Sequence, residues 1–191
     1  MTSQLLLPIL IASGISLYIF SVALKTSMVR CQSYTGMLKT SLSFALTQGL
    51  LFSLGWYISI SLVGWIPSFA QPLGMIVFFL LGTKIILLAA DKKSDPALFD
   101  VSRLNILLLL SIATATNGFI AGLGTGLIQI ALVPAVYILS GLTFLFSLSG
   151  IVTGKTSGKF TLAFYIQIGG GMIILLAGIL LLLDALNILK P

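Results

Sequence analysis

Apolar residues occur in six long runs along the chain, and short polar segments separate these runs. The runs cover residues 5–24, 40–60, 73–90, 104–122, 127–149 and 162–183. A helix rises about 1.5 Å per residue, so about 20 apolar residues match the hydrocarbon thickness of a bilayer. The runs are continuously apolar rather than alternating, which excludes a β-barrel. We therefore predict an all-α polytopic membrane protein with six transmembrane helices.

The composition supports this class. Charged residues make up 7% of the chain, hydrophobic residues make up 58%, and the mean hydropathy is +1.18. A soluble domain of this length needs roughly a quarter of its residues charged. The first run follows no basic stretch and is longer than the apolar core of a typical signal peptide. We therefore expect it to be a membrane helix and not a cleaved signal peptide. We expect a multi-pass protein of the cell (inner) membrane, with the lipid bilayer as its main partner.

Basic residues lie in three of the five connections between the runs. They are Lys25, Arg30 and Lys39, then Lys92, Lys93 and Arg103, then Lys155 and Lys159. The other two connections, residues 63–72 and the turn near residues 124–126, carry none. By the positive-inside rule the basic connections face the cytoplasm, which places both termini outside it. This topology accounts for the net charge of +6, so no nucleic-acid partner is expected.

The residue inventory excludes most catalytic and metal chemistry. Histidine and glutamate do not occur, and the lone Cys31 falls in a predicted cytoplasmic connection. Without a nucleophile next to a base we expect no enzyme, and we expect no metal site and no cofactor. Gly154-Lys155-Thr156 lacks the glycine that a phosphate loop requires at position 149, which is Ser149, so we expect no nucleotide either.

The two halves of the chain show weak similarity. The segment beginning Gly82-Thr-Lys-Ile-Ile-Leu-Leu resembles the one beginning Gly170-Gly-Met-Ile-Ile-Leu-Leu, and Phe20 corresponds to Phe119. Repeats of three spans must lie in opposite orientations, because an odd number of crossings reverses the chain. We predict a single membrane domain, 1–191, built from two inverted three-helix repeats, 1–90 and 104–191. A charged cytoplasmic loop, 91–103, joins them.

Glycines predict where helices pack closely. Gly118, Gly122 and Gly126 recur every four residues, and Gly14 plays a similar part in the first run. Helices in lipid associate through small faces of this kind, so helix packing is the expected role. Pro134 falls inside the fifth run and is expected to kink it.

Neutral polar residues at membrane depth are the candidates for a substrate path. They are Ser16, Tyr18, Gln48, Thr114, Thr116 and Asn117. Tyr18 and Asn117 each lie about 13 residues, or ~20 Å, from the start of their run, on opposite sides of the bilayer. Inverted repeats would bring the two together, although serine, threonine and amide side chains also serve as ordinary contacts between helices. Lys84 is a possible membrane-embedded cation, which we expect to extend toward the cytoplasmic edge.

These positions give the chain a resemblance to a known family over nearly its whole length. It resembles the MntP-type manganese exporters, six-span proteins of the wider LysE-like transporter group. The resemblance rests on Gly14-Ile-Ser-Leu-Tyr-Ile-Phe-Ser, Leu38-Lys-Thr-Ser-Leu-Ser-Phe, Leu54-Gly-Trp, Leu81-Gly-Thr-Lys, Ile112-Ala-Thr-Ala-Thr-Asn-Gly and Gly150-Ile-Val-Thr-Gly-Lys-Thr-Ser-Gly.

The resemblance also shows where this chain departs from the family pattern. It implies membrane aspartates in the first and fourth spans and a glutamate in the second, at positions that are Tyr18, Asn117 and Gln48 here. The basic residue of the third span is kept as Lys84. Neutral oxygens hold Mn²⁺ far more weakly than carboxylates, so we expect a substrate other than manganese.

Two functions remain open from the sequence. The first is export of a small ion or solute through a site lined by Tyr18, Gln48 and Asn117. The second is an accessory or structural subunit of a larger membrane complex, which does not transport. A homodimer is a separate expectation for the assembly of this chain. The aromatic residues at 78–79 and 144–146 are candidate contacts for that second function.

Overall fold

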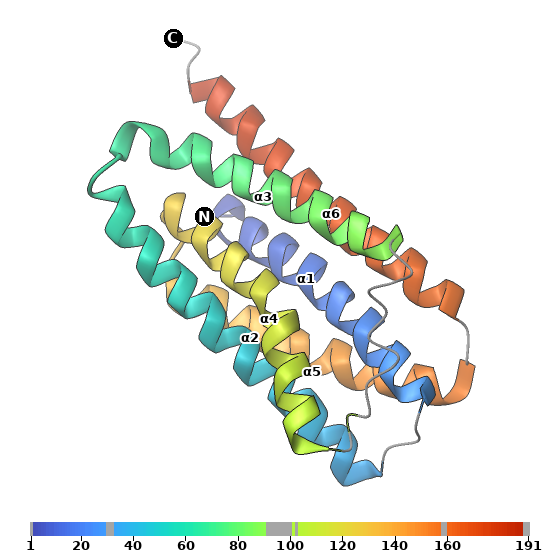
Figure 1. Cartoon of the computed structure of the whole chain (residues 1–191). Helices are drawn as coiled ribbons and strands as arrows, with labels where there is room; N and C mark the ends of the chain where they lie inside the picture. The colour runs from blue at the N-terminus through green and yellow to red at the C-terminus, as the bar shows by residue number, and fades with distance from the viewer. Residues whose placement is uncertain (1, 30–32, 91–100, 102, 158–159, 189–191) are drawn as a thin grey trace.

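The chain folds into six long helices. The computed structural model describes residues 2–29, 33–90, 101, 103–157 and 160–188, with the side chains of 2–5, 29, 157, 160 and 184–188 left aside. The helices are α1 (Thr2–Val29), α2 (Tyr34–Val63), α3 (Pro67–Ala90), α4 (Leu104–Leu127), α5 (Leu132–Ser157) and α6 (Phe160–Ile188) (Figure 1). Each is long and apolar enough to cross a membrane. The predicted all-helical class with six spans is confirmed.

Some predicted features lie outside the described residues. Of the charged segment 91–103, only Val101 and Arg103 are described, and Cys31 is outside as well. The four acidic residues of the chain are Asp91, Asp95, Asp100 and Asp184, and none of their side chains is described.

The helices extend beyond the apolar runs that predicted them, and one predicted turn is misplaced. The turn expected near residues 124–126 is helical, because α4 continues to Leu127. The chain instead reverses around Gln129, whose φ of 57° is left-handed. Gly124 stays in the helix because it packs against the Phe78 ring, where a Cβ atom would come within 2.8 Å.

The predicted kink at Pro134 is also absent. Because α5 begins at Leu132, Pro134 lies in its first turn, where the missing N–H has no helical partner to lose. Pro8 in α1 and Pro72 in α3 lie in the second turn of their helices, where each removes one backbone hydrogen bond of the helix.

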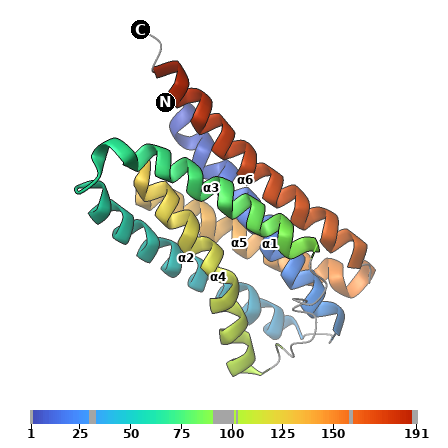
Figure 2. The same cartoon turned by 45° about the horizontal axis from the view of Figure 1, so that its top comes forward.

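Each half of the chain contributes one central helix to the bundle. The first helix, α1, packs against α5 and α6, and α4 packs against α2 and α3. Two further pairs, α2 with α5 and α3 with α6, complete the assembly (Figure 2). The start of α1 and the end of α6 lie at the same end of the bundle (Figure 1). Residues from all six helices therefore meet in the interior.

The predicted packing glycines lie where two helices approach each other. A Cβ atom on Gly14 would come within 2.7 Å of the Gly170 carbonyl oxygen, and one on Gly122 would overlap the Phe52 carbonyl oxygen. Gly126 similarly faces Ser59. Such contacts leave no room for a side chain, so these glycines set the distances between α1 and α6 and between α2 and α4.

The buried apolar side chains form two clusters. One includes Ile15, Phe52, Phe78 and Ala121, and the other includes Ile19, Phe44 and Leu107. Phe78 is fully buried, whereas its neighbour Phe79 is 56% exposed. The expectation that both residues form an outward contact pair is therefore wrong for Phe78, because its ring fills the gap that Gly124 leaves.

Candidate functional site

Buried polar side chains lie between the two apolar clusters. In α1, α2, α4 and α5 they occupy the sequence interval between residues of one cluster and residues of the other. Tyr18 packs against both clusters. We call this set the polar layer. Its buried members are Ser16 of α1, Gln48 of α2, Thr114 and Asn117 of α4, Thr143 and Ser147 of α5, and Gln167 of α6, and its half-buried members are Tyr18 of α1 and Lys84 of α3.

Asn117 connects three helices within the polar layer. Lys84 Nζ donates a hydrogen bond of 2.8 Å to Asn117 Oδ1, and the Tyr18 side chain hydrogen-bonds with Asn117 as well. The structure thus brings Tyr18 and Asn117 together, at the mirrored depths that the sequence indicated. Lys84 does not extend toward the cytoplasmic edge as expected. Its ammonium points into the bundle because the Asn117 amide offers an acceptor there.

A second group of hydrogen bonds connects α1 to α5 and α6, and α6 to α3. Ser16 Oγ and Thr143 Oγ1 lie 3.4 Å apart, and Ser21 Oγ donates to Gln167 Oε1 at 3.1 Å. Gln167 Nε2 donates to the backbone oxygen of Ile85 at 3.3 Å. Ile85 follows Lys84 in α3, so this amide braces the turn of helix that carries the lysine.

Gln48 is one of two members of the polar layer whose side chains have no hydrogen-bond partner among the described residues. Its side chain is 0% exposed, yet neither Nε2 nor Oε1 has a hydrogen-bond partner among the described residues. The amide lies over Gly118, where a Cβ atom would come within 3.0 Å of Gln48 Oε1. Ser147 is also fully buried and without a partner for its hydroxyl in the described chain. A buried amide without partners carries a desolvation cost that a bound ligand can relieve.

The remaining predicted candidates differ in their surroundings. Thr114 is buried, but its hydroxyl donates back to the Ser111 carbonyl oxygen at 3.0 Å. Thr116 is exposed and bonds to the Ala113 oxygen, so it lies apart from the polar layer. Both contacts are the ordinary helical bonds of threonine.

The sequence interpretation missed three members of the polar layer, Thr143, Ser147 and Gln167. Gln167 carries the same signal as Gln48, an amide inside an apolar run, and the depth argument applied to α6 would have selected it. Thr143 and Ser147 give no such signal, because hydroxyl side chains are common in membrane helices.

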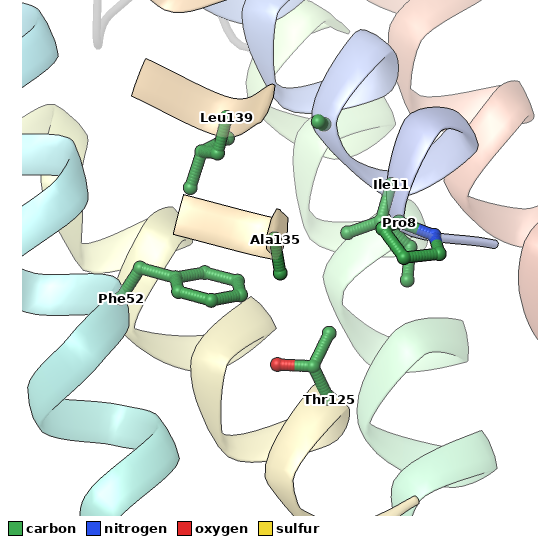
Figure 3. A pocket seen from close by; sticks show the side chains of 7 residues that line it. Pro8, Ile11, Phe52, Thr125, Ala135 and Leu139 are labelled. Carbon is green, nitrogen blue, oxygen red and sulfur yellow. The ribbon is translucent and has the colours of Figure 1, made fainter. Parts of the chain in front are cut away.

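The described residues contain no group of three histidine, cysteine or acidic side chains that could hold a metal ion. A cavity of about 10 Å³ is lined mostly by residues of the first apolar cluster (Figure 3). Its lining is Pro8, Ile11, Ala12, Phe52, Thr125, Ala135 and Leu139. The Thr125 hydroxyl already bonds to the Gly122 oxygen at 3.0 Å, so this cavity offers little to a polar ligand.

Comparisons with known proteins agree with the residue pattern. The family model described as "Putative manganese efflux pump" (MntP) matches residues 31–182. A "Putative manganese efflux pump MntP" of Methanocorpusculum labreanum is 31% identical, covering 96% of this chain and 98% of that protein. Those of Desulfitobacterium hafniense and Methanothermobacter thermautotrophicus are 29% and 27% identical, and each covers about 95% of both chains. No solved structure matches the chain. The chain is a member of the MntP family of membrane transporters.

Proposed function

We propose that the protein exports a small ion or solute across the membrane through the polar layer. The observation that carries this proposal is Gln48, a fully buried amide with no partner among the described residues, beside the linked Lys84, Asn117 and Tyr18. Transporters of this general kind place their substrate near the midplane, where helices of two repeats meet. All six helices contribute a side chain at that level.

The packing of the helices supports two inverted halves. Exchanging α1–α3 with α4–α6 turns the α1–α5 contact into α4–α2 and the α1–α6 contact into α4–α3. The same exchange leaves the α2–α5 and α3–α6 contacts unchanged. The same interval along the chain separates Tyr18 from Asn117 and Gln48 from Ser147. The two members of the polar layer that have no partner among the described residues therefore occupy corresponding positions. Rocking of one half against the other would open the layer to each side in turn.

Manganese fits the polar layer poorly. A hard divalent cation requires oxygen ligands that also supply negative charge, and the positions that carry carboxylates in the family pattern are Tyr18, Gln48 and Asn117. The charge present is that of Lys84. A divalent cation 4 Å from an ammonium is repelled by roughly 8 kcal/mol at an effective dielectric constant of about 20. We infer that this chain has diverged from the manganese substrate named for its relatives.

Flux through reconstituted protein tests the proposal. Proteoliposomes would be assayed with a panel of small cations, anions and neutral polar solutes, with Mn²⁺ included. We expect saturable flux of at least one solute and at least a tenfold loss in Gln48→Ala and Asn117→Ala. Absence of flux for every solute, or full flux in both variants, would overturn transport through this layer.

One observation supports a second function, that of an accessory subunit. Lys84 and Tyr18 both bond to Asn117, and the cavity described above does not include these three residues. A layer held closed in this way would suit a relative that stabilises a larger assembly. Purification in mild detergent distinguishes the two functions, because an accessory subunit should retain a second protein species. Recovery of this chain alone or as a homodimer would count against that function.

A further inference from the structure

We propose that the ligand of the polar layer is a small monovalent anion held by Lys84 and Gln48. This inference rests on the proposed function and names the class of its substrate. It starts from the basic group of the layer, because Lys84 is the basic side chain that bonds to a member of this layer in the described part of the chain.

The partner of Lys84 leaves its charge uncompensated. Asn117 Oδ1 accepts one hydrogen bond from the ammonium at 2.8 Å, but an amide is neutral. No side chain of the four aspartates is among those described, and in the sequence none lies in the central part of a span. A charged side chain within a membrane span normally pairs with an opposite charge or serves a substrate. An anion that enters the layer supplies the missing charge.

Free hydrogen-bond donors in the layer match an anion. An ammonium has three N–H donors, and one of those on Lys84 is used by Asn117. Gln48 Nε2 offers two more, which have no partner in the described structure. The amide that carries them lies over Gly118, the residue after Asn117, so Gln48 and Lys84 contact consecutive residues of α4. A cation would be repelled by these N–H groups, because their hydrogen atoms carry partial positive charge.

The packing around the layer limits the size and charge of the anion. A Cβ atom on Gly118 would come within 3.0 Å of Gln48 Oε1, and one on Gly122, one turn further along, would overlap the Phe52 carbonyl oxygen, so the helices beside Gln48 are closely packed. A single fixed positive charge is neutralised by a single negative charge. Both features favour an anion of the size of chloride, nitrate or formate over phosphate or a larger carboxylate.

Binding by the purified full-length protein is the first measurement. Its unfolding temperature would be followed against potassium chloride, nitrate and formate, with potassium gluconate holding the ionic strength constant. We expect saturable stabilisation by at least one of the three salts. Lys84→Gln should weaken the apparent affinity at least tenfold, whereas Lys84→Arg, which keeps the charge, should retain the response. Lys39→Gln removes the same charge from an exposed position of α2 and should behave like the parent.

A second variant tests the same site independently, in case Lys84→Gln does not fold. Asn117→Asp is nearly isosteric and places a carboxylate beside the ammonium, so it should compete with the anion and also weaken the salt response at least tenfold. Flux of the same anions into proteoliposomes is then measured for all five proteins.

The outcomes separate this inference from the proposed function. Anion binding that requires Lys84, without flux of any solute, supports the anion site and overturns transport. Flux of a cation or neutral solute, with no anion binding or flux, supports transport and overturns the anion site. A salt response that Lys84→Gln and Asn117→Asp leave unchanged would also overturn the anion site.

Discussion

Two glutamines inside the membrane differ in what surrounds their amides. Gln167 is 3% exposed, and both ends of its amide are used, by Ser21 and by the Ile85 carbonyl. Gln48 is equally buried, and neither end is used among the described residues. The Gln167 amide therefore stabilises the helix assembly. The Gln48 amide instead imposes a desolvation cost that a bound ligand would offset.

This contrast predicts that Gln48→Met stabilises the protein and Gln167→Met destabilises it. Methionine matches glutamine in shape, so each change mainly removes the amide. We expect a gain of about 1–2 kcal/mol for Gln48→Met and a loss of about 1–2 kcal/mol for Gln167→Met, because a buried polar group is costly only when unpaired. Thermal unfolding in detergent measures both. Flux should be lost in Gln48→Met, and a stable variant that still transports would contradict the assignment of Gln48 to the site.

Glycine positions allow a similar matched comparison. Gly122→Ala would push a methyl group into the Phe52 carbonyl oxygen, a backbone atom that cannot move without shifting α2. We expect this change to cost about 1–3 kcal/mol of stability. Gly141→Ala on α5 meets no atom within 4 Å and should be neutral or slightly stabilising. Equal unfolding temperatures for the two variants would show that α2 and α4 do not depend on the Gly122 contact.

At the scale of the elements, the connection between α4 and α5 is held by a few backbone groups. Trp56 Nε1 donates to the Ile130 oxygen at 2.8 Å, and Ile130 N donates to the Thr125 oxygen at 3.0 Å. Between them Gln129 has a φ of 57°, a conformation that disfavours residues with a Cβ atom. The turn is therefore fixed by its neighbours rather than by its own sequence.

Gln129→Gly should stabilise this connection. Glycine removes the left-handed penalty of about 1–2 kcal/mol, and its greater freedom in the unfolded chain returns about 0.5–1 kcal/mol of that gain. We expect a net gain of about 0.5–1 kcal/mol, read as a higher unfolding temperature. Gln129→Val is the opposite test. A β-branched residue is strained in this conformation, so the variant should have a lower unfolding temperature than the parent. The reverse order of the two variants would mean that the turn adopts another conformation.

The sequence predicted the helices better than their ends. Six apolar runs sufficed for six spans, because about 20 apolar residues have few other stable states in lipid. The α4–α5 turn was misplaced, because glycine was interpreted as a breaker, whereas Gly124 serves as a contact for Phe78. Pro134 was expected to kink a helix whose true start lies only two residues earlier. Such details depend on tertiary contacts that periodicity does not contain.

For the molecule as a whole, the depth of a residue within its apolar run selected three members of the polar layer. Mirrored depth selected Tyr18 and Asn117, which the structure joins, and membrane burial of an amide selected Gln48. The direction of Lys84 did not follow, because it depends on the acceptor that α4 presents across the helix interface. The exposed position of Thr116 likewise required the packing of α4.

The predicted orientation of the whole chain can be tested with its single cysteine. The positive-inside rule places Cys31, which lies outside the described residues, in the cytoplasm. We expect a membrane-impermeant maleimide to leave Cys31 unlabelled in intact cells and to label it after permeabilisation. In a Cys31→Ser background, Trp65→Cys in the opposite connection should be labelled in intact cells, since this residue is 87% exposed. The inverse labelling pattern would show that the predicted topology is wrong.

The charge of the interior, finally, should decide which class of ion the fold accepts. The family resemblance predicts that Tyr18→Asp, Gln48→Glu and Asn117→Asp together place three carboxylates around Lys84. Such oxygen ligands supply the charge that a hard cation needs on leaving water. We expect the triple variant to take up Mn²⁺ into proteoliposomes at least ten times faster than the parent. If the parent already exports Mn²⁺ at the rate of the variant, the neutral side chains do not limit the substrate, and the divergence inferred above is wrong.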